Sequence, residues 1–563
     1  MKILLIHSDY IEFEPRQKAI KLAEDWPKEK TRVEECLVVF IAVEKSDEGK
    51  VDEVTKKMVG EVVNIANQVK TKKIVFYPYA HLSKDLSSPS TALQVLRSAE
   101  ELAKEKGFEA CHAPFGWYKA FELKAKGHPL SELSRDIGAE SVSAAEIKAK
   151  KKQEKKPAKQ EEAKELSEND HRVLGQKMDL YSFHEFAPGM AFFHPKGMTI
   201  RNELINFSQS EHAKRGYREI VTPLVMNKSV WETSGHWDHY KENMFFTSID
   251  DAEFAVKPMN CPGAILVFKS ATRSYRELPL RLSEYGVVHR NELSGVLSGL
   301  FRVRGFTQDD AHIFVTEGQL EKEIEDVVDT IDYFYKIFGF DYHVELSTRP
   351  DNAIGAKAVW DKAESALESA LKGKKMKYKI NPKEGAFYGP KIDFHIKDSL
   401  GRTWQCATVQ VDFMMPERFD ISFTGEDNKP HRPVIIHRVV YGALERFIGI
   451  LVEHYKGAFP LWLSPIQVRV LPLSDKNKDA AEKVLEKLRD GGIRADNDVR
   501  PSTVEYRVRE AELQKINFIV VIGEKEETTG TIAVRTRGKK EIQFGVKLDD
   551  FLKRLKAEVE EKR

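Results

Sequence analysis

The stretch HRNELSGVLSGLFRVRGFTQDD, residues 289–310, gathers charged groups around large aromatic side chains. Arg290 and Arg302 carry guanidinium groups, whose planar forks match the geometry of phosphates and carboxylates. Phe301 and Phe306 are inserted between these charges. Each charge taken alone fits a surface salt-bridge network. The interleaving of charges with aromatics favours a lined pocket for an anionic ligand.

The sequence around this stretch divides into four parts. Residues 171–460 are rich in aromatics, Gly and Pro and contain the antiparallel-looking strands KIDFHI and TWQCATVQVDF. Residues 1–140 alternate apolar strands with helical stretches, which predicts an α/β domain. Residues 461–563 form a βαβαβ series, typical of a small parallel sheet. We therefore expect a multidomain chain of α/β and α+β type.

Residues 141–170 contain almost no large apolar side chain. Such a segment cannot bury enough surface to offset the entropy of ordering, which predicts a charged linker. Its lysines offer a second interpretation, a basic arm on RNA, although neighbouring glutamates partly cancel their charge.

The composition describes a soluble globular protein. The chain is 41% hydrophobic and 31% charged, a composition that excludes a wholly disordered protein. Its length of 563 residues is enough for about three or four domains. Four scattered cysteines and no apolar run of about 18 residues predict a reducing, cytoplasmic location without a membrane partner. The 89 basic against 88 acidic residues first argue against a nucleic-acid partner. A near-neutral chain can still bind RNA through local, salt-sensitive positive patches.

Several strings in residues 171–460 resemble the catalytic domain of the class II aminoacyl-tRNA synthetases, specifically the threonyl-tRNA synthetase family. RGYREIVTPLV (residues 215–225), the opening stretch and YGALERFIGIL (441–451) resemble the three class motifs. WETSGHWDHY, VKPMNCPGA, GAFYGPKIDF and TWQCATVQVDF resemble segments of the threonyl type. The resemblance implies a class II antiparallel-sheet domain that forms threonyl-adenylate and charges tRNA(Thr), in a homodimer with Pro223 at the interface.

The resemblance implies how ATP is bound, since no Walker-type loop is present. Arg290 and Arg446 would contact the α- and γ-phosphates, and fixed guanidinium donors would stabilise charge that develops in the transition state. Lys391 would assist near pyrophosphate, and Mg²⁺ would accompany the triphosphate. The ATP-binding set implied is Arg290, Glu292, Arg302, Phe306 and Arg446, and the catalytic set is Arg290, Lys391, Arg446, His236 and Gln410, with the last two near the terminal ribose of tRNA.

Cys261, His312 and His437 match the zinc ligands of the family. Their spacing alone favours a buried cysteine and two hydrogen-bonded histidines, and only the surrounding motifs PMNCPG, QDDAHIF and VIIHRVV favour a metal site. Three protein ligands leave an open position, as in a zinc that binds substrate. The resemblance implies one Zn²⁺ per subunit, bound by the amino group and hydroxyl of threonine, which excludes the nearly isosteric valine. The residues implied around threonine are Gln308, Asp310, Tyr388, Gln405 and Thr408.

Serine differs from threonine by one methyl group, worth only about 1–3 kcal/mol, so a second selection step is needed. LLIHSDY, YAHLS, APFGWYKAF and GHPLSELSR in residues 1–140 resemble the archaeal-type editing domain, which is related to D-aminoacyl-tRNA deacylases. This implies hydrolysis of seryl-tRNA(Thr) at a site lined by His81, Tyr118, Lys119 and Glu132. Each of these also suits an ordinary loop or surface residue.

Residues 461–563 resemble the anticodon-binding domain of class II synthetases, which implies that Arg509, Glu526 and Arg535 read single-stranded anticodon bases. Surface charges of a helix or strand are the alternative. Two further hypotheses are a catalytically inactive paralogue that regulates RNA, and another class II synthetase such as a prolyl or seryl enzyme. The first is disfavoured by Arg290, Arg446 and the three candidate zinc ligands, and the second by the zinc ligands alone. We expect tRNA(Thr), ATP and L-threonine as partners, and no DNA.

Overall fold

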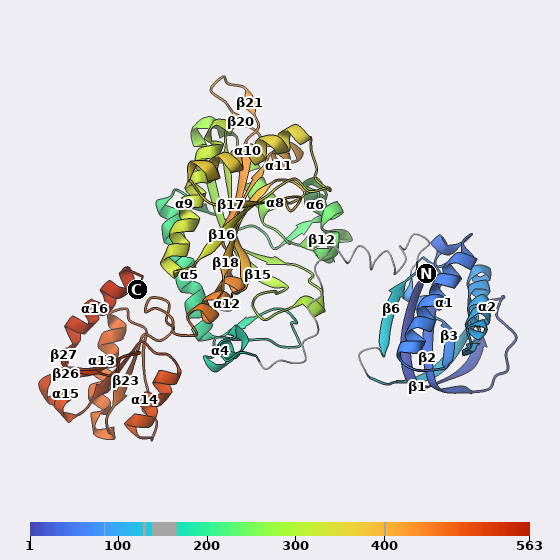
Figure 1. Ribbon diagram of the computed structural model, residues 1–563, viewed down its shortest axis with the longest axis horizontal. Coiled ribbons are helices and arrows are strands. Elements are labelled where there is room, and N and C mark those ends of the chain that lie inside the picture. The colour runs from blue at the N-terminus through green and yellow to red at the C-terminus, as the bar shows by residue number, and fades with distance from the viewer. Residues whose placement is uncertain (84, 128–130, 138–165, 399–400, 563) are drawn as a thin grey trace. The chain divides into compact units, whose positions relative to one another are not determined.

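The computed structural model describes residues 1–83, 85–127, 131–137, 166–398 and 401–562, which form two compact units, 1–163 and 164–563 (Figure 1). The predicted linker, residues 141–170, lies mostly outside the described residues. No helix in the described ranges is long and apolar enough to cross a membrane.

The first unit is a six-stranded sheet with two helices against one face (Figure 1). The strand order is β4-β3-β2-β1-β5, and β6 pairs with β1 beyond the end of β5. β2, β3 and β4 are parallel, whereas β1 runs antiparallel to its neighbours. The elements are β1 (Lys2–Lys18), β2 (Thr31–Ala42), α1 (Val51–Gln68), β3 (Lys73–Pro78), α2 (Pro89–Glu105), β4 (Glu109–His112), β5 (Trp117–Ala125) and β6 (Glu132–Asp136).

The second unit is built on an eight-stranded, mainly antiparallel sheet, as expected for residues 171–460. Its strands, in spatial order, are β17 (Tyr378–Asn381), β16 (Tyr342–Ser347), β18 (Lys391–Lys397), β19 (Thr403–Asp412), β22 (Val434–Ala443), β15 (Gly305–Val315), β14 (Leu280–His289) and β9 (Arg218–Glu219). The main helices are α4 (His171–Lys177), α5 (Pro195–Lys214), α9 (Leu320–Phe338), α10 (Lys357–Gly373) and α12 (Leu444–His454).

Helix α9 shows why one face of this sheet is closed. Its buried residues Leu320, Ile324, Val327, Ile331 and Phe334 recur every three or four positions and form an apolar stripe. Gly339 ends the helix with φ of +70°, a conformation that glycine adopts without strain. The stripe joins the main hydrophobic core against one face of the sheet, which leaves the other face for a site.

Smaller elements surround the large sheet. They are β7 (Tyr181–Ser182), β8 (Phe192–Phe193), β10 (Val225–Asn227), α6 (Lys228–Ser234), α7 (His236–His239), β11 (Phe245–Ile249), β12 (Ala252–Val256), α8 (Cys261–Lys269), β13 (Arg273–Ser274), α11 (Met414–Arg418), β20 (Phe423–Thr424) and β21 (Pro430–His431).

The C-terminal part of the second unit has its own five-stranded sheet, in the order β24-β23-β25-β26-β27. The first three strands are parallel, as the βαβαβ pattern predicts, but β26 and β27 are antiparallel. The sheet is therefore mixed, not wholly parallel. The elements are β23 (Val468–Pro472), α13 (Lys478–Asp490), β24 (Ala495–Asn497), α14 (Val504–Leu513), β25 (Phe518–Ile522), α15 (Glu524–Thr529), β26 (Thr531–Thr536), β27 (Ile542–Lys547) and α16 (Leu548–Glu560).

Candidate active site

A cavity of about 450 Å³ lies on the face of the eight-stranded sheet that α9 leaves uncovered. Phe306, Gln308, Asp310 and His312, spaced by two along β15, line it. Side chains alternate between the faces of a strand, so these four share one face, whereas Ile313 packs into the main core.

The cavity brings together every residue that sequence reasoning assigned to ATP, threonine or metal. These are Cys261, Arg290, Glu292, Arg302, Phe306, Gln308, Asp310, His312, Tyr388, Lys391, Gln405, Thr408, Gln410, His437 and Arg446.

Cys261, His312 and His437 converge although they come from α8, β15 and β22. All three are buried, and their ligand atoms lie within 4.8 Å of one another. Nε2 of His312 is buried without a hydrogen-bond partner among the described residues. Burial lowers the pKa of His312 and raises that of the Cys261 thiol. An orphaned imidazole nitrogen beside a thiol and a second imidazole fits a zinc ion, which would satisfy all three groups.

Neighbouring polar groups hold this trio in place. Nε2 of His437 lies 3.0 Å from Oδ2 of Asp412, which leaves Nδ1 as the nitrogen that can bind a metal. Nδ2 of Asn260 donates to Asp310 at 3.1 Å, and burial raises the pKa of Asp310 to about 6. Asp310 is thus an acceptor aimed into the cavity beside the trio.

The opposite end of the cavity is strongly cationic. Arg290, Arg302, Lys391 and Arg446 line it; Arg302 pairs with Glu292 and Lys391 pairs with Asp393. Arg446 is anchored by backbone carbonyls, since its Nε donates to Phe301 O at 2.9 Å and its Nη1 to Gln405 O at 3.0 Å. The guanidinium of Arg290 lies 5.1 Å from the Phe306 ring centroid. A polyanion with a flat ring system would complement these groups.

Asp393 organises the wall formed by β18 and β19, and sequence reasoning missed it. Its carboxylate contacts Nζ of Lys391 at 2.6 Å and accepts from Thr408 Oγ1 at 3.1 Å and Gln405 Nε2 at 2.5 Å. Alternation along KIDFHI places Lys391 and Asp393 on one face, which is the signal that could have found it. A register shift between Asp393 and His395 brings Gln405 and Thr408 to the same side despite their odd spacing.

His236 is the one predicted catalytic residue that does not line the cavity. Its imidazole is fully buried, with Nδ1 2.8 Å from Ser234 Oγ and Nε2 2.9 Å from Met259 Sδ. Burial lowers its pKa to about 3. Its ring contacts that of Tyr388, so the structure places it behind the cavity wall.

Two of the editing candidates, His81 and Lys119, lie on the second face of the N-terminal sheet. Nζ of Lys119 donates to Pro114 O at 2.9 Å and Trp117 O at 3.2 Å, and it lies 5.0 Å from the Tyr77 ring. His81 packs edge-on to Tyr79, whose ring contacts Phe40 beside Tyr77. Aromatic rings therefore connect His81 and Lys119 through one cluster.

The other two editing candidates are less closely tied to that cluster. Tyr118 is 66% exposed and, as the neighbour of Lys119 on β5, points to the opposite face. Glu132 is exposed on β6 and pairs with Ile6. A cavity of about 600 Å³ in this unit, around Arg32 and Cys111, contains none of the four candidates.

The three anticodon candidates differ in exposure. Arg509 is exposed on α14, and Arg535 is partly buried on β26. Glu526 is buried, and its Oε2 accepts the backbone N–H of Gly523 at 3.1 Å at the start of α15. Its carboxylate is used in capping that helix, which is a structural role.

Comparison with known proteins matches three successive regions of the chain. Residues 1–137 match the archaea-specific editing domain of threonyl-tRNA synthetase, residues 245–455 the class II synthetase core domain, and residues 467–558 an anticodon-binding domain. A solved structure described as the RNA-binding domain of threonyl-tRNA synthetase from Cryptosporidium parvum is 40% identical, with a TM-score of 0.67. The match covers 69% of this chain and 98% of that one. The chain belongs to the threonyl-tRNA synthetase family.

Other threonyl-tRNA synthetases support this membership. The chain assigned as ThrRS-1 of Aeropyrum pernix is 31% identical with a TM-score of 0.60, and 95% of it is covered. The threonine--tRNA ligase of Caldanaerobacter subterraneus is 57% identical over 396 residues, which is 70% of this chain and 61% of that protein. That of Desulforamulus reducens is 56% identical, with 62% of it covered. The match thus spans about three fifths of the length of these curated relatives.

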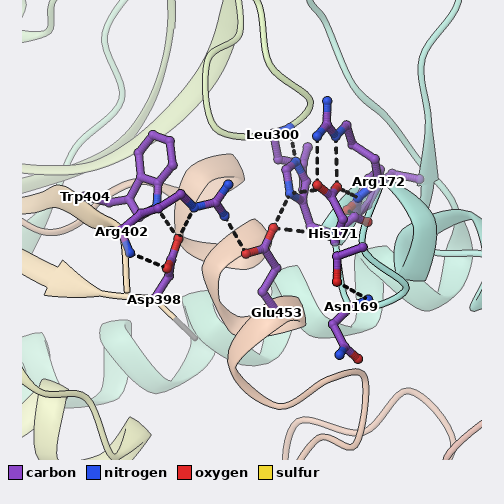
Figure 2. A network of polar contacts seen from close by, with 11 residues as sticks. Asn169, His171, Arg172, Leu300, Asp398, Arg402, Trp404 and Glu453 are labelled. Carbon is purple, nitrogen blue, oxygen red and sulfur yellow. Dashed lines mark hydrogen bonds and ion pairs between the residues drawn. The ribbon is translucent and has the colours of Figure 1, made fainter. Parts of the chain in front are cut away.

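A buried network in this threonyl-tRNA synthetase chain holds the loop that anchors Arg446 (Figure 2). His171, 1% exposed, places Nδ1 2.8 Å from Oε1 of Glu453, and its Nε2 accepts the Leu300 N–H at 3.1 Å. Nε2 must therefore be unprotonated, with the imidazole proton on Nδ1. The His171 ring packs 4.1 Å from that of Phe301, whose carbonyl receives Arg446.

The other side of the network joins the same loop to β19. Oε2 of Glu453 accepts from Arg402 Nη2 at 2.7 Å, and Arg402 also pairs with Asp398 (Figure 2). Trp404 Nε1 donates to Asp398 at 2.8 Å, and its ring packs on Phe301. The network therefore fixes the Phe301 carbonyl from two directions, and His171 is a positioning residue for Arg446.

Replacing His171 with Ala is expected to raise the KM for ATP about tenfold, while the KM for threonine changes little. The reason is that the Leu300 N–H loses its buried acceptor, which costs about 1–3 kcal/mol and loosens the loop that carries the Phe301 carbonyl. Steady-state pyrophosphate exchange measures both constants. Arg172→Ala, which breaks a partly exposed ion pair with Asp170, is the control and should leave both unchanged. Equal rises in the two KM values would contradict the positioning role.

Proposed function

We propose that the chain ligates L-threonine to tRNA(Thr) through a threonyl-adenylate, with ATP and Mg²⁺ as co-substrates. The observation that carries this proposal is one cavity with two unlike ends. A Cys-His-His trio beside Asp310 lies at one end, and Arg290, Arg302 and Arg446 lie at the other. The first end suits a hydroxy amino acid, and the second suits a nucleoside triphosphate.

Recognition of threonine is the role proposed for the trio. Cys261, His312 and His437 would hold one zinc ion, which supplies a Lewis-acid position that a hydroxyl group can occupy and a methyl group cannot. Asp310 is placed to accept the hydroxyl proton of the substrate, and Asn260 holds its carboxylate in place. Valine, which lacks that hydroxyl, would leave these polar groups unpaired.

The first reaction step needs fixed positive charge at the α-phosphate. The threonine carboxylate attacks the α-phosphorus, the bond to the bridging oxygen breaks, and pyrophosphate leaves. Arg290 and Arg446 would stabilise the charge on the phosphoryl oxygens, and anchoring by backbone carbonyls keeps Arg446 oriented before ATP arrives. Phe306 would stack on the adenine, and Lys391 would contact the departing pyrophosphate.

In the second step a hydroxyl of the terminal ribose attacks the threonyl carbonyl, and AMP leaves. Gln410 is the candidate for orienting the ribose, because its Nε2 is held at 3.0 Å from Gly389 O while the side chain lines the cavity. His236 would act through Tyr388, against which its ring packs.

The N-terminal unit is proposed to hydrolyse mischarged seryl-tRNA(Thr). Lys119 is the residue best supported for this role, because its ammonium group is oriented by two carbonyls and an aromatic ring. His81 lies on the same aromatic cluster, while Tyr118 and Glu132 are exposed and able to meet a large substrate.

Editing by Lys119 is expected to depend on pH. Burial lowers the pKa of Lys119 to about 8, partly offset by Glu24, so the fraction of the charged form falls as pH rises through that value. After subtraction of uncatalysed hydrolysis, deacylation of seryl-tRNA(Thr) by the full chain should therefore decline above about pH 8. Lys119→Met should abolish it at every pH. Lys119→Arg, which stays charged, should flatten the profile; an unchanged decline in this variant would contradict the assignment.

A homodimer and a cytoplasmic location complete the proposal. Val221 (86% exposed) and Leu224 are exposed apolar side chains beside Pro223, in the segment that resembles the first class motif. Leu266 on α8 is a third exposed apolar side chain. An exposed apolar patch of this kind suits an interface with a second copy. The four cysteines are free, in keeping with a reducing compartment.

Amino-acid-dependent exchange of pyrophosphate into ATP tests the function. We expect strong exchange with threonine, weaker exchange with serine and negligible exchange with valine. Removal of zinc should abolish the exchange with threonine and with serine. Full activity after verified loss of zinc would refute the proposed recognition. Exchange with proline alone would instead assign the chain to another class II specificity.

A further inference from the structure

A second group of metal-binding side chains lies outside the cavity, on strands β16 and β18. His343 and His395 stand directly opposite each other in this antiparallel pair. Glu345 is two residues from His343 and therefore projects from the same face. Directly opposed residues have Cβ atoms about 4.5–5.5 Å apart, so the sheet itself sets the spacing of the two imidazoles.

The distances in this group suit a shared ion better than hydrogen bonds. Oε1 of Glu345 lies 3.6 Å from His343 Nε2, and Oε2 lies 3.7 Å from His395 Nε2. Both exceed ordinary hydrogen-bond lengths. The ligand atoms of all three lie within 4.8 Å of one another. Bonds of about 2.0–2.2 Å in a tetrahedral site place neighbouring ligand atoms about 3.4 Å apart, close to the observed separations.

The two imidazoles stack against each other beside one carboxylate. Their rings lie 4.9 Å apart and are tilted by only 11°. Because an imidazole binds a metal in the plane of its ring, the half-exposed His343 ring must turn about its side-chain bonds for both imidazoles to share one ion. Glu345 provides the one negative charge of the trio, and Asn381 Nδ2 holds its Oε2 at 3.0 Å. Asp393, further along β18, is already engaged by Lys391. An outer partner that orients a ligating carboxylate is typical of metal sites.

A third group of similar composition has its ligand atoms occupied by hydrogen bonds. Asp170, His171 and Glu453 also bring ligand atoms together, but N–H donors occupy them. Leu300 N–H donates to His171, while Arg402 pairs with Glu453 and Arg172 with Asp170. That group is a completed hydrogen-bond network. The group on β16 and β18 has contacts of imidazole with carboxylate that are too long to be such bonds.

We propose that His343, Glu345 and His395 form a second zinc site, separate from the Cys261 trio in the cavity. Three protein ligands of the types that zinc prefers leave one position for water or a partner group. The His343 side chain is 49% exposed, so the ion exchanges with solvent and is held more weakly than one in the buried cavity. The proposal is independent of the reaction assigned to the cavity.

Zinc stoichiometry of the full chain tests the site. After removal of metal with a chelator, equilibrium dialysis against zinc alone should load two ions per wild-type chain. His343→Ala/His395→Ala should load one, and Glu345→Gln should weaken the second site more than tenfold. The matched control is His431→Ala, because His431 is 48% exposed and pairs with a single carboxylate, that of Asp427. This variant should still load two ions.

Cobalt substitution distinguishes the two sites even if one variant folds poorly. Only the cavity trio contains a thiolate, so the sulfur-to-cobalt charge-transfer band should persist in His343→Ala/His395→Ala while the weaker d–d absorption falls by about half. A wild-type chain that loads a single ion, lost in Cys261→Ser and retained in the double variant, would overturn the proposal. Loss of the charge-transfer band in the double variant would overturn it equally.

Discussion

Replacing Arg446 with Ala should lower threonine-dependent pyrophosphate exchange by about 10²–10³-fold, the cost typical of removing one preorganised donor from a developing negative charge. The side chain is buried at the cationic end of the cavity, and two backbone carbonyls hold it. No carboxylate among the described residues forms an ion pair with it. Its electrostatic contribution is therefore available to ATP at the moment of reaction. Initial rates at saturating ATP and threonine measure the effect.

Two further variants separate charge from geometry at this position. Arg446→Lys keeps the charge but cannot make both carbonyl contacts, so we expect recovery of only part of the lost rate. Arg432→Ala is the matched control, since Arg432 also bonds a backbone carbonyl, that of Ile421, but lies away from the cavity. This control should retain the wild-type rate. An Arg446→Ala enzyme within about threefold of wild type would exclude a role in phosphoryl stabilisation.

Replacing Cys261 with Ala should remove the cavity zinc and, with it, detectable activation of threonine. Removal of the outer partner of a metal ligand typically costs about 10–100-fold in metal affinity or activity. Removal of the ligand itself should cost more. Asp412→Asn offers that smaller loss for comparison, because Asp412 reaches the metal trio only through the far nitrogen of His437. Its Oδ1 also accepts the backbone N–H groups of Met414 and Met415, so the amide variant must be checked for folding. Metal content and exchange rate, measured on the same preparations, should fall together across the series.

The control for this series is another buried cysteine. Cys36 lies in the N-terminal unit, so the Cys36→Ala variant should retain both zinc and exchange activity. A Cys261→Ala protein that binds threonine as tightly as wild type, without zinc, would show that the hydroxyl is recognised by Asp310 and its neighbours alone.

Much of the cavity could be predicted because its residues lie on regular strands. Phe306, Gln308, Asp310 and His312 follow strict alternation, so one assignment in β15 fixes the other three. Lys391 on β18 also lies at a cavity-facing position. The mainly antiparallel sheet of the catalytic domain and the parallel start of the C-terminal sheet were confirmed.

The remaining features depend on irregular or long-range contacts that a single sequence does not reveal. Gln405 joins Thr408 only through the register shift between β18 and β19. His236 was expected beside the ribose, but it packs behind Tyr388 because Ser234 and Met259 satisfy its ring nitrogens. Glu526 was expected to face RNA, but it caps α15. The antiparallel strands β26 and β27 add to an otherwise parallel pattern, and the short helix α15 between β25 and β26 does not make a parallel crossover.

The arrangement of β15 imposes a fixed length on the substrate. His312 of the metal trio follows Phe306, which is proposed to stack on the adenine, by six positions. Six steps along a strand measure about 20 Å. β14 pairs with β15 without interruption over this span, so the strand has no slack. An insertion of one residue directly after Phe306 would turn Thr307, Asp309 and Ala311 toward the cavity, so Phe306 would keep its place while His312 lost its own. β15 therefore fixes the distance between the nucleotide end and the metal end of the site. The side chains at either end can be replaced, but the distance between the two ends cannot change independently.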